Sequence, residues 1–374
     1  MKQSTRLAPV VGEALRDIIG GTTHALALTL LLAFLTVATT GLDLISIARI
    51  ERQASDYVTT GGATTILDYP GHIDGQACDR LSQVSGVLAS GAVKTANGKL
   101  TPAATPSNTI PSYEISPGAV RIFRTAVNER GETDTIRDGG ILLSHDAATP
   151  LAIRSGGQFT TVDDDTVHVL DVYQWPDDGR QTTYSYAALI PAQAAQTFDQ
   201  CWITTWPTPK NTSELLRTSI TGDISNDTDG SKPKTLALNT SQGSSLDAAG
   251  LYQQRLTGIM PTIMSALCFI LALIMVRARR LEIASSLHAG LPKASLALQH
   301  LIETFVWSLS AMLIAAAPLF ISATYLIPTC DLPTVLTATF ATTAVAALTG
   351  TTAGTILAIL IIRERHLFVY FKNR

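Results

Sequence analysis

Four apolar runs are long enough to cross a lipid bilayer, and one large polar block separates the first run from the second. A spanning helix needs about 20 apolar residues. The sequence is only 15% charged and 46% hydrophobic, which also favours a membrane protein. We therefore expect four transmembrane α-helices, with a large mixed α/β domain, residues 44–255, inserted between the first and second. The runs are residues 24–43, 256–276, 305–327 and 335–362.

Basic residues gather in the segments on one side of these runs. Residues 1–23, 277–304 and 363–374 hold eleven Lys and Arg against five Asp and Glu, whereas residues 43–255 hold 16 against 24. Loops rich in Lys and Arg stay on the cytoplasmic side of a membrane. We expect a multi-pass protein of the cell (inner) membrane with both termini in the cytoplasm, the large domain outside, and residues 328–334 as a short outer turn.

The first 23 residues predict a cytoplasmic amphipathic leader. Between residues 10 and 21, apolar side chains alternate with charged ones at a period that suits a helix on the membrane surface. A disordered leader is the alternative. The first apolar run resembles a signal peptide, but its leader is long and contains Glu13 and Asp17, and no small-residue cleavage site follows it. We expect a retained anchor.

The two ends of the outer domain predict stalk helices. The apolar pattern continues past the first span, and residues 246–255 match it on the return, where Ser244 and Asp247 resemble a helix cap. Between the stalks, β-branched or alternating runs predict strands at residues 64–67, 113–122, 160–173 and 184–190. Helices are predicted at residues 74–84 and 191–199. A loop or loosely held strands are predicted at residues 207–243.

Four cysteines have different predicted roles. Cys78 and Cys201 lie in the outer domain, where oxidation is permitted, so a disulfide between them would join its early and late parts. Two unpaired thiols are the alternative. Cys268 lies in the middle of the second run, where we expect a packing residue. Cys330, in the outer turn, is expected to be either an unpaired thiol or a partner of another subunit.

The cytoplasmic segment 277–304 predicts a short amphipathic helix and then a sharp corner. Apolar residues recur every four positions on one stripe of that helix, formed by Ile283, Leu287 and Leu291. Charged residues lie off the stripe, namely Arg279, Arg280 and Glu282. Gly290 suits a helix end, and Pro292 prevents simple continuation but can begin a second helix. This second helix, which includes Lys293 and runs through Leu296, Leu298 and Leu301, would enter the third apolar run.

This segment resembles the signature of the MacB/FtsX-type (type VII) ABC transporter permeases. The order is Glu282-Ile283-Ala284, then Gly290 eight positions after the Glu, then Glu303 thirteen positions after the Gly. That family usually continues after the Gly with a small residue, Ser or Thr, and basic residues, whereas this chain has Leu291-Pro292-Lys293. The motif covers about thirty residues, and the layout of the whole chain agrees with it.

The resemblance implies the permease subunit of an ABC transporter, with a coupling segment that contacts a separate cytoplasmic ABC ATPase. It also implies a homodimer or a related pair, and mechanotransmission in which ATP hydrolysis moves the outer domain. The cargo class implied is a lipid, lipoprotein, peptide or hydrophobic compound. The implied ATPase-coupling residues are Arg279, Arg280, Glu282, Ile283, Leu287, Gly290, Leu291, Pro292, Lys293 and Glu303.

Sequence signatures of enzymes are missing. The chain has no G-x-S-x-G, no H-E-x-x-H, no paired C-x-x-C and no G-x-x-x-x-G-K-[ST] motif. We therefore expect no enzymatic activity and no cofactor in this chain, with ATP and Mg bound by the partner ATPase. We expect no nucleic acid partner.

Polar residues outside the motif have ordinary interpretations. Asp163-Asp164-Asp165 could attract a divalent cation but lacks the spaced oxygens of a calcium loop, so a solvated turn is favoured. His288 and His300 are expected at a surface or an interface. Glu303, at the inner end of the third run, is expected either to serve coupling or to pair with a basic neighbour such as Arg277 or Lys293.

Two sets of residues within the apolar runs suggest packing. Gly350 and Gly354 form G-x-x-x-G in the fourth run, which favours close helix packing, with self-association through that face as the alternative. The methionines are expected to fill the core rather than to bind haem. They are Met260, Met264, Met275 and Met312.

Two other functions fit the layout. An FtsX-like regulator would activate a cell-wall hydrolase bound to the outer domain without transporting anything. A membrane receptor or scaffold without an ATPase explains the topology but not the spacing of the motif.

Overall fold

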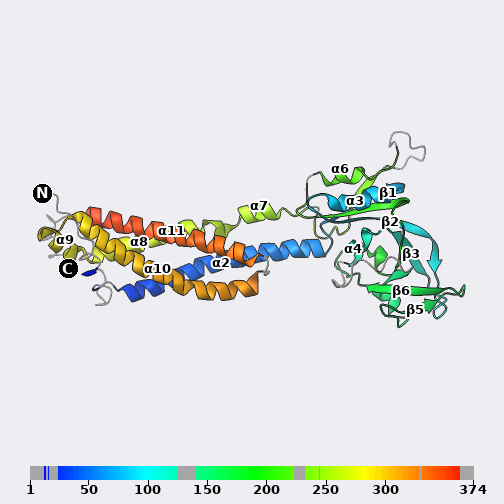
Figure 1. Ribbon diagram of the computed structural model, residues 1–374, viewed down its shortest axis with the longest axis horizontal. Helices are drawn as coiled ribbons and strands as arrows, with labels where there is room; N and C mark the ends of the chain where they lie inside the picture. Colours follow the sequence, from blue (N-terminus) through cyan, green and yellow to red (C-terminus); the bar gives the residue numbers. More distant parts are fainter. Residues whose placement is uncertain are drawn as a thin grey trace. The chain divides into compact units, whose positions relative to one another are not determined.

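Four long apolar helices form one part of the chain (Figure 1). They are α2 (Ala25–Thr59), α8 (Met260–Ala278), α10 (Lys293–Leu326) and α11 (Leu332–Ile361), and the second of these is preceded by α7 (Ala248–Gln253) and the short turn η4 (Leu256–Ile259). All four are long and apolar enough to cross a membrane, as expected from the sequence. This computed structural model describes residues 12, 13, 16, 24–124, 140–209, 211–222, 232–243, 245–327 and 331–362.

The chain divides into two compact units. The helical unit comprises Met1–Glu51 and Ala249–Arg374, and the sheet unit comprises Arg52–Ala248. In the helical unit, buried aliphatic side chains of all four long helices form one core. Large apolar side chains such as Leu26, Phe34 and Leu313 are exposed on the outer faces of the helices, as contact with lipid requires. Met264, Met312 and Cys268 are buried in the core, so they are packing residues as expected.

The two glycines of the G-x-x-x-G pattern lie where α11 packs against α8. A Cβ atom on Gly350 would lie 2.2 Å from the carbonyl oxygen of Ser265, and one on Gly354 would lie 2.4 Å from that of Phe269. Both obstacles are backbone atoms, so the helices touch at these points only because the side chains are absent. The close helix packing expected from the pattern is therefore present, and this face packs on a helix of the same chain rather than serving the alternative, self-association.

Among the residues of the sheet unit that the structure describes, nine strands of mixed direction form one sheet in the order β5-β6-β4-β7-β3-β2-β8-β1-β9. The pairs β3/β7 and β4/β6 are parallel, and the other pairs are antiparallel. The strands are β1 (Thr64–Asp74), β2 (Val87–Leu100), β3 (Ile110–Ile115), β4 (Ile141–Ser144), β5 (Gln158–Thr160), β6 (Thr166–Tyr173), β7 (Ala188–Pro191), β8 (Thr197–Thr205) and β9 (Lys234–Ala237). The expectation of a mixed α/β domain is confirmed.

Short helices cover the sheet, and one of them carries the disulfide. They are α3 (Gly75–Arg80), η1 (Leu81–Gln83), α4 (Ala119–Arg124), α5 (His145–Ala148), η2 (Thr182–Tyr184) and α6 (Thr212–Arg217). The Asp74 side chain caps α3 by accepting from the backbone of Gln76 and Ala77. The structure joins Cys78 of α3 to Cys201 of β8, the pairing expected from the sequence, inside a second apolar core.

Several sequence expectations for this unit need correction. Residues 191–199 do not form a helix, because β7 ends at Pro191 and β8 begins at Thr197, where pairing with β1 and β2 overrides the helical tendency of Ala and Gln. The strand expected at 113–122 stops at Ile115, since the Ser-Pro-Gly turn leads into α4. The strand expected at 184–190 begins only at Ala188. Among the described residues of 207–243, strand β9 agrees with the strands that were one of the two expectations, whereas helix α6 was not predicted.

The two predicted stalks differ. α2 continues without interruption to Thr59, as expected. The segment 246–255 is not one helix, because α7 ends at Gln253 and Arg255 has extended backbone angles of φ −59° and ψ 131°. Ser244, Cys330, most of the leader 1–23 and the tail 363–374 lie outside the described residues.

Candidate functional site

The predicted corner lies between α8 and α10 and contains its own helix, α9 (Arg280–His288). Gly290 has φ 93°, a left-handed conformation that suits glycine. The Gly290 backbone N–H donates to the carbonyl of Leu287 at 3.0 Å, and that of Leu291 donates to the carbonyl of Ser286 at 3.1 Å. This pair of bonds is the Schellman ending of a helix. The chain therefore turns sharply after α9, and Pro292 caps α10 from outside rather than forming its first residue.

The apolar stripe of α9 faces the end of the helical unit. Ile283 and Leu287 are buried, together with Ala284. They pack in one cluster with residues of α8, α10 and α11, and with the residue after α11, namely Val276, Leu296, Ala358, Ile359 and Ile362. Leu291 is 48% exposed, so its predicted place on the stripe is wrong, because the chain has already turned at Gly290. This cluster fixes α9 to three of the four long helices.

Arg279 lies at the break between α8 and α9 and joins both α9 and α10. Its Nη1 lies 2.6 Å from Oε2 of Glu303, and its Nη2 lies 2.7 Å from Oε1 of Glu282. Its Nε donates to the second Glu282 oxygen at 2.9 Å, so that pair is bidentate. Nδ1 of His300 also lies 3.2 Å from Oε2 of Glu303. One arginine thus ties the corner helix to the third span.

Glu303 pairs with a basic neighbour, as one of the two alternatives expected, although that neighbour is Arg279 and not Arg277 or Lys293. The Lys293 ammonium instead donates to the carbonyl of Ile362 at 3.2 Å. The expectation for His300 needs correction. His300 is 4% exposed, not a surface residue. The sequence contained a hint, because His300 and Glu303 are three positions apart and share one face of a helix.

The interior of this cluster is too small to be a substrate site. Arg279, His300 and Glu303 line a cavity of about 30 Å³, together with Trp307 and Thr355. A volume of that size has room for one or two water molecules. Within the part of the chain that the structure describes, no group of three or more His, Cys, Asp or Glu could hold a metal ion.

The opposite side of the corner is exposed and mixed in character. Glu282, His288, Gly290, Leu291 and Lys293 are exposed. Arg280 is half-buried. An exposed leucine among charged residues on a fixed turn is a surface that a partner protein could contact. All ten predicted coupling residues thus belong to one corner. Five of them are exposed, Arg279 and Arg280 are partly buried, and Ile283, Leu287 and Glu303 are buried.

A second ion pair, which sequence reasoning missed, links α2 to the segment before α8. Nε of Arg255 donates to Oδ1 of Asp43 at 2.9 Å, and the guanidinium lies 4.0 Å from the ring centroid of Tyr252. α8 is therefore followed by Arg279, bound to α10, and preceded by Arg255, bound to α2.

Comparisons with known proteins find little. No family model matches this chain, and no curated protein matches it. Among solved structures it is similar to the periplasmic region of MacB from Actinobacillus actinomycetemcomitans, at 10% identity and a TM-score of 0.32. The match covers 45% of this chain and 86% of the other. A likeness this weak establishes no family.

Proposed function

We propose that this chain is the permease subunit of an ABC transporter of the MacB/FtsX type, and that its corner helix is the contact for a separate cytoplasmic ATPase. ATP and Mg would be bound by that partner, since this chain has no phosphate-binding loop. The corner would lie in the cytoplasm, in accord with the basic residues around it. The sheet unit would lie outside.

One observation carries the proposal: α9 is attached to the helical unit by both apolar contacts and ion pairs. Ile283 and Leu287 bury the inner stripe, and Arg279 bonds to Glu282 on α9 and to Glu303 on α10. A packed interface resists deformation. A push on the exposed side of α9 would therefore move α8 and α10 with it, rather than bend the corner.

The proposal extends to the assembly and the cargo. The permease would act as a homodimer or a related pair, and ATP hydrolysis would move the outer domain in order to export or extract a lipid, lipoprotein, peptide or hydrophobic compound. These details rest on the resemblance of the corner motif.

Co-purification with ABC ATPases encoded in the same genome tests this function. The tagged full chain would be co-expressed with each ATPase, and bound ATPase would be measured for wild type, Leu291→Glu and Glu282→Lys. Leu291→Glu adds a negative charge to the exposed side of the corner, and Glu282→Lys replaces a negative charge there with a positive one. Asp163→Lys, in an exposed turn of the sheet unit, is the control. We expect one ATPase to bind wild type and the control but not the two corner variants. Equal binding by all four chains would refute the corner as the contact.

A further inference from the structure

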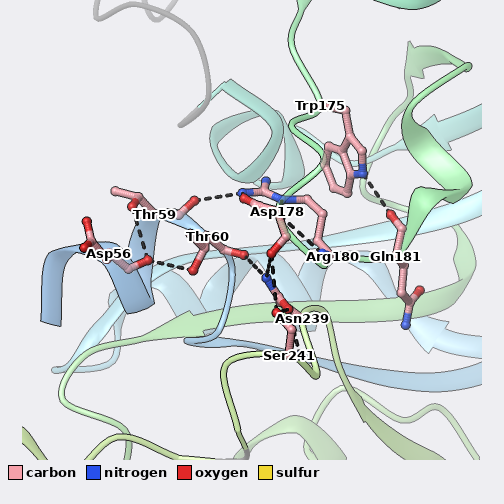
Figure 2. Close-up of polar contacts among 9 residues, drawn as sticks. All are labelled: Asp56, Thr59, Thr60, Trp175, Asp178, Arg180, Gln181, Asn239 and Ser241. Atoms are coloured by element: carbon pink, nitrogen blue, oxygen red, sulfur yellow. Dashed lines mark hydrogen bonds and ion pairs between the residues drawn. The ribbon is translucent and has the colours of Figure 1, made fainter. Parts of the chain in front are cut away.

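The end of α2 is held by side chains that come from distant parts of the sheet unit (Figure 2). The last carbonyls of a helix have no partner within it, and the last turn of α2 contains no basic residue. Nη2 of Arg180 donates to the carbonyl of Thr59 at 2.8 Å. Nδ2 of Asn239 donates to the carbonyl of Thr60 at 2.8 Å. These donors lie 121 and 179 positions further along the chain.

Arg180 is itself held in place from several directions. Its Nε and Nη2 bond to the two carboxylate oxygens of Asp178 at 2.9 and 2.6 Å, and its guanidinium lies 5.0 Å from the ring centroid of Trp175. Nε1 of Trp175 donates to the carbonyl of Gln181 at 2.8 Å. Arg180 is only 8% exposed. A cation near the negative end of a helix is also favoured by the helix dipole.

Asn239 connects the same helix end to the loop that carries Arg180. Its Nδ2 also donates to the carbonyl of Asp178 at 3.0 Å, while its Oδ1 accepts from the hydroxyl of Ser241 at 2.6 Å. It is fully buried. The backbones of Arg180 and Asn239 pair as an isolated β-bridge. Gly179, at φ 94°, permits this approach, since a Cβ there would lie 2.3 Å from the Ser241 hydroxyl.

The residues between α2 and β1 leave no room for a loose linker. Gly61 has φ 81°, and a Cβ there would lie 2.9 Å from Leu238. A Cβ on Gly62 would lie 2.6 Å from the ring of Tyr57, which is buried. β1 begins immediately afterwards, at Thr64. The segment between α2 and β1 is therefore packed against Leu238 on one side and Tyr57 on the other.

We propose that Arg180 and Asn239 are positioning residues that lock the end of α2 to the sheet, so that the last turns of the helix and the sheet unit move as one body. Helix ends usually fray. Here the buried side chains of Arg180 and Asn239, which come from distant positions in the sequence, donate hydrogen bonds that prevent fraying. The value of this lock to the protein rests on the proposed function, in which ATP hydrolysis moves the outer domain. The lock itself needs no ATPase.

Distances between two spin labels test the lock in the full chain, reconstituted in lipid nanodiscs. Labels at Gln53→Cys on α2 and Asn97→Cys on β2 occupy exposed positions of the sheet unit. Cys268 and Cys330 are replaced, and the disulfide is kept. We expect a narrow distance distribution in wild type and in the control Arg154→Gln, an exposed arginine. In Arg180→Gln, and in Arg180→Gln with Asn239→Ala, we expect it to broaden about twofold.

Readouts of folding separate a lost lock from a damaged domain. The near-ultraviolet circular dichroism of the buried aromatic residues and the protection of the disulfide should stay as in wild type. If Arg180→Gln does not fold, Arg180→Lys serves in its place. It keeps the charge but not the bidentate contact with Asp178, and should broaden the distance distribution to a smaller extent. Distributions as narrow as wild type in the folded variants, or a broad one in wild type, would overturn the proposal. A failure to bind any ATPase would contradict the proposed function and leave this result unaffected.

Discussion

Nη1 of Arg279 lies 2.6 Å from Oε2 of Glu303, although the two residues are 24 positions apart. Arg279 lies at the break between α8 and α9, and Glu303 lies within α10. Glu303 is 4% exposed, and its partner also holds the exposed Glu282. The two acids therefore bond to the same arginine in different surroundings. Their removal should have different effects.

Glu303→Gln should lower the free energy of unfolding by about 3 kcal/mol. The reason is that the partly buried guanidinium of Arg279 loses the buried carboxylate that pairs with it. Glu282→Gln should lower it by less than about 1 kcal/mol, since a pair with an exposed partner is screened by water. Thermal unfolding of both variants in detergent measures this difference. Equal shifts would show that burial does not distinguish the two pairs.

Gly354→Ala should destabilise the helical unit by about 1 to 3 kcal/mol, since the new methyl group meets the backbone of α8 and forces the helices apart. Gly41→Ala is a matched control within α2, because a Cβ there meets nothing within 4 Å. The control should be neutral or stabilise by up to about 1 kcal/mol, the helix propensity of Ala over Gly. Thermal unfolding in detergent again gives the comparison, and the same loss in both glycine variants would argue against close packing at Gly354.

Burial raises the pKa of the Asp79 carboxyl, and hydrogen bonds from Ser116 and Gly118 offset part of that effect. A carboxyl with a raised pKa binds its proton more tightly in the folded state, so its stabilising contribution is full below the unfolded pKa of about 3.9 and falls as the pH rises to the folded value. Above the folded pKa the contribution is at its lowest and constant.

The pH dependence of Asp79 can be measured by denaturant unfolding, followed by the fluorescence of the buried Trp175 and Trp202. Asp79→Asn should remove this part of the pH dependence. Ser116→Ala should extend it to higher pH, because the bond that lowers the pKa is lost. An unchanged pH profile in Asp79→Asn would contradict the assignment.

Cys78→Ser with Cys201→Ser should lower the stability of the sheet unit by roughly 4 to 5 kcal/mol, because the disulfide closes a long loop. Its sequence separation is 123 residues. Wild type should lose the same amount when a reductant is added. Cys268→Ser should respond to reductant as wild type does, since Cys268 is a free buried thiol in the helical unit. A reductant without effect on wild type would contradict the prediction.

The sequence by itself determined what depends on local pattern and composition. The four spans follow from long apolar runs, because lipid accepts backbone only when its hydrogen bonds are internal. The corner follows from Gly290 and Pro292, whose backbone preferences hold in any context. The mixed domain and the pairing of Cys78 with Cys201 were also expected.

Only the tertiary structure decided which distant groups meet. Residues 191–199 resemble a helix locally, yet β8 begins within them because its neighbours in the sheet come from elsewhere in the chain. Arg279 and Glu303 are partners, and Arg180 reaches the end of α2, since the fold brings these donors and acceptors together. Hydrogen bonds and ion pairs form between groups that are close in space, and a periodicity of three or four residues contains no information about neighbours 24 or 121 positions away.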